Sequence, residues 1–260
     1  MKVTHFSVIL VWLLAAFFIA APAFVFSLQE SPEYDEIRHL LAKGDAAAAA
    51  EAWQQMEPLA GKEYLHWYNL GVLLYDLERY PQAVEAFRSA LQDYDDLSLA
   101  AKDHSEAVFN LGTALLQAGE YVQAVAVFSA MALTVSREDV FLNRGNAYYM
   151  LGDNEQALAD YSAAIGYAAG NADAWYNIGN IHYDAERWQE SAEAYQTALE
   201  LQPDYLEAKF NLGNVLMQLQ QYAEAQQWYQ AVLRDDPMHS DAMESLKIAE
   251  SMQEKKQGQQ

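Results

Sequence analysis

The sequence predicts an all-α protein in which short helix-turn-helix units stack into a solenoid with a capping helix at its C-terminal end. Two observations carry this prediction. A pattern of 34 residues recurs along the chain and is most regular from Ala172 to Tyr205. The composition suits packed helices, because the 260 residues include only 6 prolines and are 52% hydrophobic.

The most regular unit predicts two helices that cross closely and then stop. Gly179 in the first helix and Ser191 in the second are small where the helices meet, while Ile178 and Tyr195 supply apolar bulk. Pro203 ends the second helix, because proline lacks an amide hydrogen and has a fixed φ angle. Neither helix buries its apolar side alone, so the next unit must cover it.

The same register holds in five copies. The small residue of the first helix recurs as Gly71, Gly112, Gly145, Gly179 and Gly213. The small residue of the second helix recurs as Ala83, Ala124, Ala157, Ser191 and Ala225. An aromatic residue follows four positions later as Phe87, Phe128, Tyr161, Tyr195 and Tyr229. Gly44, Ala49 and Trp53 fit a degenerate sixth copy upstream, at about 30 to 63.

These residues resemble the tetratricopeptide repeat, whose pattern is Trp-x2-Leu-Gly-x2-Tyr, then Ala-x3-Phe, then Pro. Trp175, Gly179, Tyr195, Ala198 and Pro203 match it within one unit. The resemblance implies a right-handed superhelical solenoid in which the first helix of each pair lines a concave groove. It covers about four fifths of the chain and specifies the fold rather than the function.

The N-terminal segment, residues 1–28, differs from everything after it. Lys2 precedes an apolar run over 6–26, which is long enough to cross a bilayer. Ala21-Pro22-Ala23 offers a signal-peptidase pattern. We therefore expect either a cleaved signal peptide or a retained membrane anchor, and in both cases a periplasmic repeat domain of the exported bacterial type, soluble or held at the inner membrane by 6–26.

The solenoid is expected over 30–239 and a capping helix and tail over 240–260. Seven extra residues near 98–104 are expected to lengthen the flanking helices. Ser240 or Asp241 is expected to cap the last helix, in which Met243, Leu246 and Ala249 form an apolar stripe. The end from Glu254 to Gln260 is expected to be frayed.

Composition excludes several functions. With 37 acidic and 15 basic residues the formal net charge is −22, which disfavours nucleic acid as a partner. The chain has no cysteine, so disulfides and thiolate metal sites are excluded. The six histidines have no metal-ligand spacing and no nucleophile or phosphate-binding motif occurs. We expect no enzyme, no cofactor and no metal.

The resemblance places a set of amide and aromatic side chains in the groove. Asparagine both donates and accepts hydrogen bonds, so a ladder of asparagines suits the backbone of an extended peptide. The alternative, that these amides bond within the solenoid, stays open. The candidate peptide-binding residues are Tyr68, Asn69, Asn110, Asn143, Asn146, Tyr176, Asn177, Asn180, Phe210, Asn211 and Asn214.

Carboxylates flank the same helical face at Asp76, Glu106, Asp139, Asp173, Asp184 and Glu207. A neutral or basic extended segment of a partner would suit this face. We therefore expect a protein–protein interaction scaffold or adaptor of the bacterial cell envelope, with envelope or membrane proteins as partners. The alternative is a structural solenoid that assembles with further copies of itself, a homo-oligomer formed through exposed end surfaces. Arg144 departs from the pattern, since leucine or isoleucine stands at this position in the sister copies. We expect a structural role for it, either paired with a carboxylate, which a buried arginine would need, or with its charged end reaching the surface.

Overall fold

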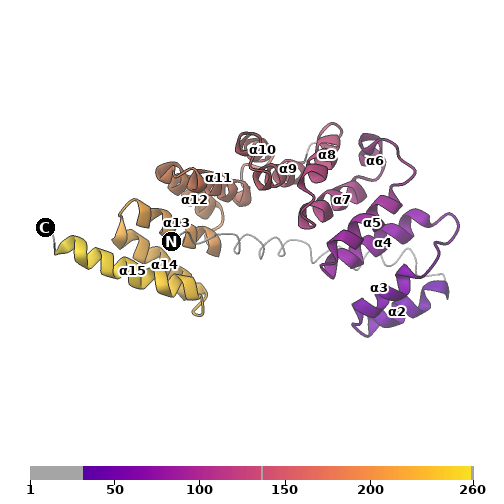
Figure 1. Ribbon diagram of the computed structural model, residues 1–260, viewed down its shortest axis with the longest axis horizontal. Helices are drawn as coiled ribbons and strands as arrows, with labels where there is room; N and C mark the ends of the chain where they lie inside the picture. The colour runs from indigo at the N-terminus through magenta and orange to yellow at the C-terminus, as the bar shows by residue number, and fades with distance from the viewer. Residues whose placement is uncertain (1–31, 136, 259–260) are drawn as a thin grey trace. The chain divides into compact units, whose positions relative to one another are not determined.

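The structure is a computed structural model that describes residues 32–135 and 137–258. The predicted signal peptide or anchor lies outside the described residues. The helices are η2 (Pro32–Tyr34), α2 (Asp35–Ala42), α3 (Ala46–Gln54), α4 (Glu63–Asp76), α5 (Tyr80–Ala90), α6 (Leu97–Asp103), α7 (Ser105–Gln117), α8 (Tyr121–Ala132), α9 (Glu138–Met150), α10 (Asn154–Tyr167), α11 (Ala172–Asp184), α12 (Trp188–Leu201), α13 (Leu206–Gln218), α14 (Tyr222–Asp235) and α15 (Ser240–Gln257). Throughout the described part of the chain the regular structure is helical, as predicted (Figure 1).

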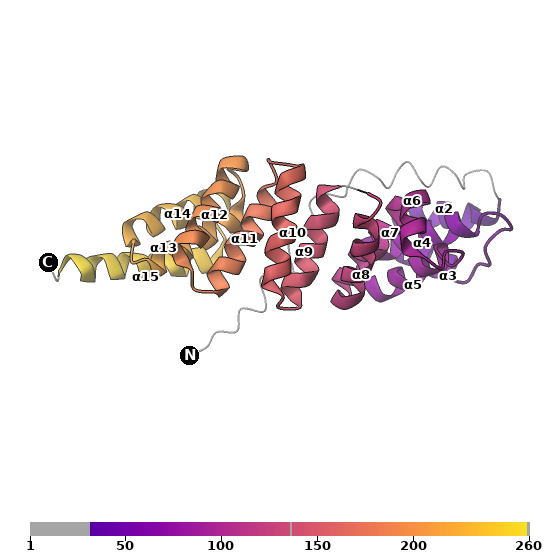
Figure 2. The same ribbon diagram turned by 90° about the horizontal axis from the view of Figure 1, so that it is seen from above.

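The chain forms two compact units that divide between Ala118 and Gly119. In the first, α2 packs on α3 and α4 packs on α5, and α7 follows against α5. In the second, α8 packs on α9, and the antiparallel pairs α9/α10, α11/α12 and α13/α14 succeed one another, with α15 against α14. Figure 2 shows the members of each pair in the second unit side by side. Because each pair packs on the next, no pair needs to shield its apolar side alone.

The turn between the first and second helix of a repeat uses one residue with left-handed backbone angles. In the turn from α11 to α12, Glu186 has φ 56° and its N–H donates to the carbonyl of Tyr183 at 2.9 Å. The N–H of Arg187 then donates to the carbonyl of His182 at 2.9 Å. These bonds satisfy carbonyls at the helix end. The corresponding residues in the other turns are Gly44, Glu78, Gly119, Gly152 and Gln220.

The predicted glycine positions lie where the two helices of a repeat touch. A Cβ added at Gly179 would lie 2.6 Å from Cδ1 and Cε1 of Tyr195. The Ser191 hydroxyl donates to the carbonyl of Gly179 at 2.9 Å, so both predicted small residues meet at this crossing. The same close approach joins Gly71 to Phe87, Gly145 to Tyr161 and Gly213 to Tyr229. The register predicted from sequence is confirmed in these four repeats.

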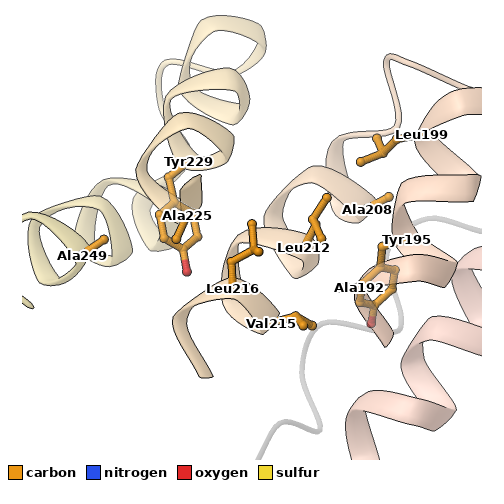
Figure 3. Packing of buried hydrophobic residues seen from close by; sticks show 10 residues of the cluster. All are labelled: Ala192, Tyr195, Leu199, Ala208, Leu212, Val215, Leu216, Ala225, Tyr229 and Ala249. Atoms are coloured by element: carbon orange, nitrogen blue, oxygen red, sulfur yellow. The ribbon is translucent and has the colours of Figure 1, made fainter. Parts of the chain in front are cut away.

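The core of the second unit runs continuously from one repeat to the next. Figure 3 shows Tyr195 of α12 close to Leu212 and Val215 of α13, and Tyr229 of α14 near Leu216. Leu212 and Val215 are fully buried. Ala249 of α15 belongs to the same cluster. The capping helix therefore covers apolar surface that a further repeat would otherwise have to bury.

Three expectations differ from the structure in detail. The extra residues near 98–104 form a separate helix, α6, because the Asp96 carboxylate accepts from the Ser98 N–H at 2.8 Å and starts a new helix. The last helix is capped by His239, whose Nδ1 accepts from the Ala242 N–H at 3.2 Å, rather than by Ser240 or Asp241. It also continues to Gln257, since Lys256 donates to the Gln220 carbonyl at 2.9 Å and holds the end in place.

The carboxylate partner expected for Arg144 is present. Its Nε and Nη2 donate to the two oxygens of Asp160 at 2.8 and 2.7 Å, and Nη1 donates to the Ser129 hydroxyl at 3.3 Å. The Asp160 side chain is only 7% exposed. Hydrogen bonding to this carboxylate raises the pKa of Arg144.

Within the described residues, none of the helices combines the length and apolar character that crossing a membrane requires.

Candidate functional site

The candidate site of the second unit lies on one face of α9, α11 and α13, which we call the first-helix face. Its predicted residues come from three successive repeats, and all are buried or half-buried. We number the positions of a repeat so that Ala172 is position 1 and Gly179 is position 8. Positions 5, 6, 9 and 12 then fall within one helical face, so these residues lie on one side of their helices. The predicted residues here are Asn143, Asn146, Tyr176, Asn177, Asn180, Phe210, Asn211 and Asn214.

An asparagine ladder connects the repeats on this face. The Asn146 carbonyl oxygen accepts from the Tyr161 hydroxyl at 2.9 Å and from Nδ2 of Asn177 in the next repeat at 3.0 Å. One repeat further on, Asn180 accepts from Tyr195 at 2.6 Å and from Nδ2 of Asn211 at 3.4 Å. Internal hydrogen bonding, which the sequence left open as an alternative, is therefore present.

The ladder ends at the last repeat. Asn214 accepts from the Tyr229 hydroxyl at 2.9 Å. The side-chain oxygens of Asn146, Asn180 and Asn214 each accept a hydrogen bond from a tyrosine hydroxyl on the second helix of the same repeat. The oxygens of Asn146 and Asn180 also accept from an asparagine amide of the next repeat. The side chains are thereby held in one orientation. Because the oxygens of Asn146 and Asn180 already accept twice, what these amides can still offer a bound chain is N–H donors.

Tyrosine hydroxyls join the carboxylates of the face to neighbouring repeats. Tyr205 donates to Asp173 at 2.9 Å, and its ring lies 4.9 Å from the ring of Tyr176. Tyr149 donates to Asp184 at 2.5 Å across one repeat. The Tyr176 hydroxyl accepts from Nδ2 of Asn211 at 3.0 Å, and burial raises the pKa of Tyr176 to about 12. The Tyr176 hydroxyl is therefore neutral at physiological pH.

The edges of the face are held by other contacts. Asn143 is buried, and its Nδ2 donates to the Asp139 carbonyl at 2.8 Å. The Asp139 carboxylate pairs with Arg137 through Nε at 3.1 Å and Nη2 at 2.6 Å. At the other end, the Phe210 ring lies 5.0 Å from the ring of His239. The pair with Arg137 neutralises Asp139, so it contributes little net charge to the face.

The face remains acidic after these contacts. Asp173 and Asp184 accept from neutral tyrosines, and neither forms a salt bridge with a cation of the described residues. Glu207 adds a third carboxylate in the first turn of α13. Asp173 also borders a shallow hollow at the loops, together with Glu138, Asn171 and Gln202. The first-helix face thus combines fixed amides and aromatic rings with uncompensated negative charge.

The first unit carries the remaining predicted residues on α4 and α7. Nδ2 of Asn110 donates to the Tyr68 hydroxyl at 3.3 Å. Tyr64 stacks on Tyr68 at 5.7 Å and on His104 at 4.1 Å. Asn69 is 6% exposed, and its Nδ2 makes no hydrogen bond within the described residues. Asn69 is thus too enclosed to reach a ligand without movement, whereas the Tyr64 and Asn110 side chains are only half-buried.

Two residues of the face were not singled out from the sequence, Tyr149 and Tyr205. The ladder itself had a signal within the chain. In repeats with asparagine at position 9 of the first helix, the aromatic residue of the second helix is tyrosine, as in Asn146 with Tyr161. Phenylalanine stands there where position 9 is Val72 or Thr113. This matched change identifies the tyrosine hydroxyl as the partner of the amide.

The described residues contain no group of three or more His, Cys, Asp or Glu side chains placed to hold a metal ion. The arrangement instead offers hydrogen-bond donors, ring faces and carboxylates along successive repeats. Such a surface suits the recognition of a polypeptide.

Comparison with known proteins places this chain among helical-repeat solenoids. A family model described as tetratricopeptide repeat matches residues 34–98, 68–134, 142–205 and 178–240. The chain belongs to the tetratricopeptide repeat family. Among curated proteins, no sequence matches it significantly.

Several solved structures share the fold. YrrB, described as a TPR protein with an unusual peptide-binding site, is 18% identical, with a TM-score of 0.55, and the match covers 88% of this chain and 100% of YrrB. MamA from Desulfovibrio magneticus RS-1 is 18% identical, with a TM-score of 0.55 and coverage of 66% and 94%. TTC0263, a thermophilic TPR protein in Thermus thermophilus, is 22% identical, with a TM-score of 0.54 and coverage of 72% and 98%.

Proposed function

We propose that this protein is a non-catalytic interaction scaffold that binds an extended, basic segment of a partner protein along its first-helix face. The observation that carries the proposal is the combination, on one face, of oriented amides from three successive repeats with carboxylates on α11 and α13 that no cation of the described residues neutralises. The repeat family supports the general class, as does the likeness to YrrB, which is described as having an unusual peptide-binding site.

The geometry of the amides favours an extended chain as the ligand. Asn146, Asn180 and Asn214 recur at one position per repeat, and their oxygens are occupied internally. N–H donors at a regular spacing match the carbonyl groups of an extended backbone irrespective of its side chains. Aromatic rings such as Tyr176 and Phe210 lie among these amides and offer apolar contact.

The charge of the face selects the partner. Asp173, Asp184 and Glu207 carry negative charge, and the chain as a whole has a formal net charge of −22. An acidic segment would be repelled, whereas lysine or arginine side chains would be attracted and steered toward the face.

We propose that the scaffold operates in the bacterial cell envelope and gathers envelope or membrane proteins. The support is the apolar run over 6–26, preceded by Lys2, which is typical of an export signal or anchor. Mass measurement of the mature protein separates these two forms, because cleavage after Ala23 would leave Phe24 as the first residue.

The test uses two fluorescent synthetic peptides of equal length that alternate valine with either lysine or glutamate. Binding to the full chain is measured by fluorescence anisotropy at low and at physiological salt. We expect the lysine peptide to bind and the glutamate peptide not to bind. The double variant Asp173→Asn and Asp184→Asn should weaken the lysine peptide by about tenfold, since each exposed ion pair contributes up to about 1 kcal/mol.

The asparagines of this variant still accept from Tyr205 and Tyr149, so the fold keeps its tyrosine bonds. The matched control neutralises Glu193 and Glu200 with glutamine on α12, where both side chains are exposed. The control should change affinity by less than twofold. Equal losses from both pairs would mean that overall charge, and not this face, attracts the peptide.

A further inference from the structure

The outward side of α8 carries large apolar side chains, unlike the equivalent rows on α10, α12 and α14. Val122 is 69% exposed and Leu133 is 81% exposed. Ala126 is exposed between them. Ser129 is half-buried, and its hydroxyl accepts from Nη1 of Arg144 on α9 at 3.3 Å. The C-cap Leu133 keeps helical backbone angles, so these residues share one side of the helix. We call Val122, Ala126, Ser129 and Leu133 the α8 stripe.

The equivalent positions on the other second helices of this unit lack large apolar side chains. On α10 they are Glu155, Ala159, Ser162 and Gly166. On α12 they are Gln189, Glu193, Gln196 and Glu200. On α14 they are Ala223, Gln227, Gln230 and Arg234. All of these residues are exposed, and the rows on α12 and α14 are mostly polar or charged. The α8 stripe is therefore a local exception rather than a general property of the outer surface.

The segment that carries the stripe has no charged residue of its own, and the charge in contact with it is the Arg144 guanidinium at Ser129. Residues 121–136 contain no Asp, Glu, Lys or Arg, in a chain with a formal net charge of −22. Two copies of so acidic a protein repel each other over most of their surface. Their closest approach is favoured where charge is absent and apolar side chains are exposed.

The pattern of the stripe is symmetric along the helix. Its members follow one another at intervals of 4, 3 and 4 residues, and the order is large, small, small, large. Reversing the helix direction gives the same pattern. Val122 of one copy would then lie over Leu133 of another, and Ala126 over Ser129. The contact would extend along about 16 Å of each helix. Such self-complementarity is what a two-fold interface between identical surfaces requires.

We propose that the α8 stripe is the contact surface for a second copy of this chain, packed as two antiparallel α8 helices about a two-fold axis. The small residues at the centre allow the helix backbones to approach closely, and the large residues at the ends fill the space beside them. A contact made by one helix pair is small compared with the interfaces of stable complexes, so we expect a weak dimer. This surface is separate from the first-helix face.

The experiment measures sedimentation velocity of the full chain in one mild detergent, from about 1 to about 100 µM. We expect a monomer that converts to a dimer as concentration rises. The variant Val122→Glu with Leu133→Glu should raise the midpoint concentration by about tenfold or more, because four carboxylates would meet at the interface. Both side chains are exposed, so the circular dichroism spectrum should not change.

The matched control places the same two charges elsewhere, as Leu151→Glu with Leu201→Glu. These leucines are 44% and 41% exposed on the same unit, and the control should dimerise as the wild type does. A second readout uses the absence of cysteine in the chain. Ala126→Cys should be cross-linked between copies by a short bismaleimide, whereas Glu193→Cys, the equivalent position on α12, should not.

Two results would overturn the proposal. One is a monomer at every concentration, which would mean that the stripe is solvated or covered by another part of the chain. The other is an association that survives the Val122 and Leu133 substitutions, which would place the contact elsewhere. Neither result affects the peptide-binding test, because that test reports on Asp173 and Asp184.

Discussion

At the scale of single residues, Arg144 and Asp160 replace apolar contacts with a partly buried ion pair. The corresponding residues in the repeat formed by α11 and α12 are Ile178 and Ala194, which pack without charge. Asp160→Ala should lower the free energy of unfolding by about 2 kcal/mol, because it leaves the guanidinium without its carboxylate. Urea denaturation measures this change.

The double variant Arg144→Leu with Asp160→Ala reproduces the apolar arrangement of the sister repeats. It should recover most of the stability lost in Asp160→Ala, since neither charge remains to be desolvated. A double variant that is less stable than Asp160→Ala alone would mean that the Arg144 contacts matter for another reason, such as its bond to Ser129.

His66 is expected to make the first unit sensitive to acid. Its ring is fully buried, and Nδ1 bonds to the Tyr34 hydroxyl at 2.9 Å. Burial lowers the pKa of His66 below its ordinary value of 6.5, so the folded state favours the neutral ring. The unfolded chain binds the proton more tightly. The contribution of the neutral His66 ring to the free energy of unfolding is therefore fully present above pH 6.5. It falls as the pH decreases from 6.5 through the pKa of the folded state.

We expect the free energy of unfolding to be lower at pH 5 than at pH 7.5, and His66→Phe to reduce this difference. Denaturation of both proteins at the two pH values is the measurement. His182, whose pKa is also lowered by burial, is present in both proteins and cancels in the comparison. An unchanged pH dependence in the variant would assign the effect to other groups.

At the scale of elements, the repeat depends on how closely its two helices approach. Gly179→Ala would bring Cβ to 2.6 Å from the Tyr195 ring, which is almost fully buried and has little room to move. We expect a loss of about 2 to 3 kcal/mol in the free energy of unfolding. Thermal and urea denaturation measure it.

Gly166→Ala is the matched control, because a Cβ there would meet no atom within 4 Å. It should leave stability unchanged or raise it by up to about 1 kcal/mol, as alanine favours a helix more than glycine does. Equal losses in the two variants would show that helix propensity and not the crossing determines the cost.

Sequence reasoning succeeded at this scale where a residue type is forced by geometry. The glycine at the crossing and the aromatic opposite it follow from size alone, and Gly71, Gly145, Gly179 and Gly213 confirmed them. It failed where alternatives of similar energy compete. The extra residues near 98–104 could lengthen existing helices or start a new one, and the Asp96 cap decided for α6.

At the scale of the whole molecule, the formal charge of −22 opposes compactness. Raising the salt concentration shortens the Debye length from about 30 Å at 0.01 M to about 8 Å at 0.15 M. The melting temperature should therefore rise with sodium chloride over this range, by a few degrees. Differential scanning calorimetry measures the shift.

Screening does not depend on which cation is present, so potassium chloride at the same ionic strength should give the same increase. A larger effect of one salt would indicate specific ion binding. A melting temperature that falls with salt would mean that attractive ion pairs, such as Arg137 with Asp139, outweigh the repulsion.

The candidate site was predicted only in part. Helical spacing placed Asn146, Asn177 and Asn180 on one face, because the period of a helix follows from local backbone geometry. Which way an amide turns depends on a hydroxyl from another helix and an amide from the next repeat. Such contacts join residues 15 and 31 positions apart in the sequence, and local helix periodicity does not predict which of these distant residues form a hydrogen bond. The role of these residues in binding stays a prediction.

By itself the sequence determined the all-α class, the repeat, its register and the excess of negative charge, because these depend on size, periodicity and composition. Only the tertiary structure decided that the asparagines form a ladder, that Asp173 and Asp184 bind tyrosines while Asp139 binds Arg137, and that the apolar side of α8 faces outward. The physical reason is that packing between helices chooses which polar groups meet and which apolar side chains stay exposed, and many such choices are compatible with one pattern of residues.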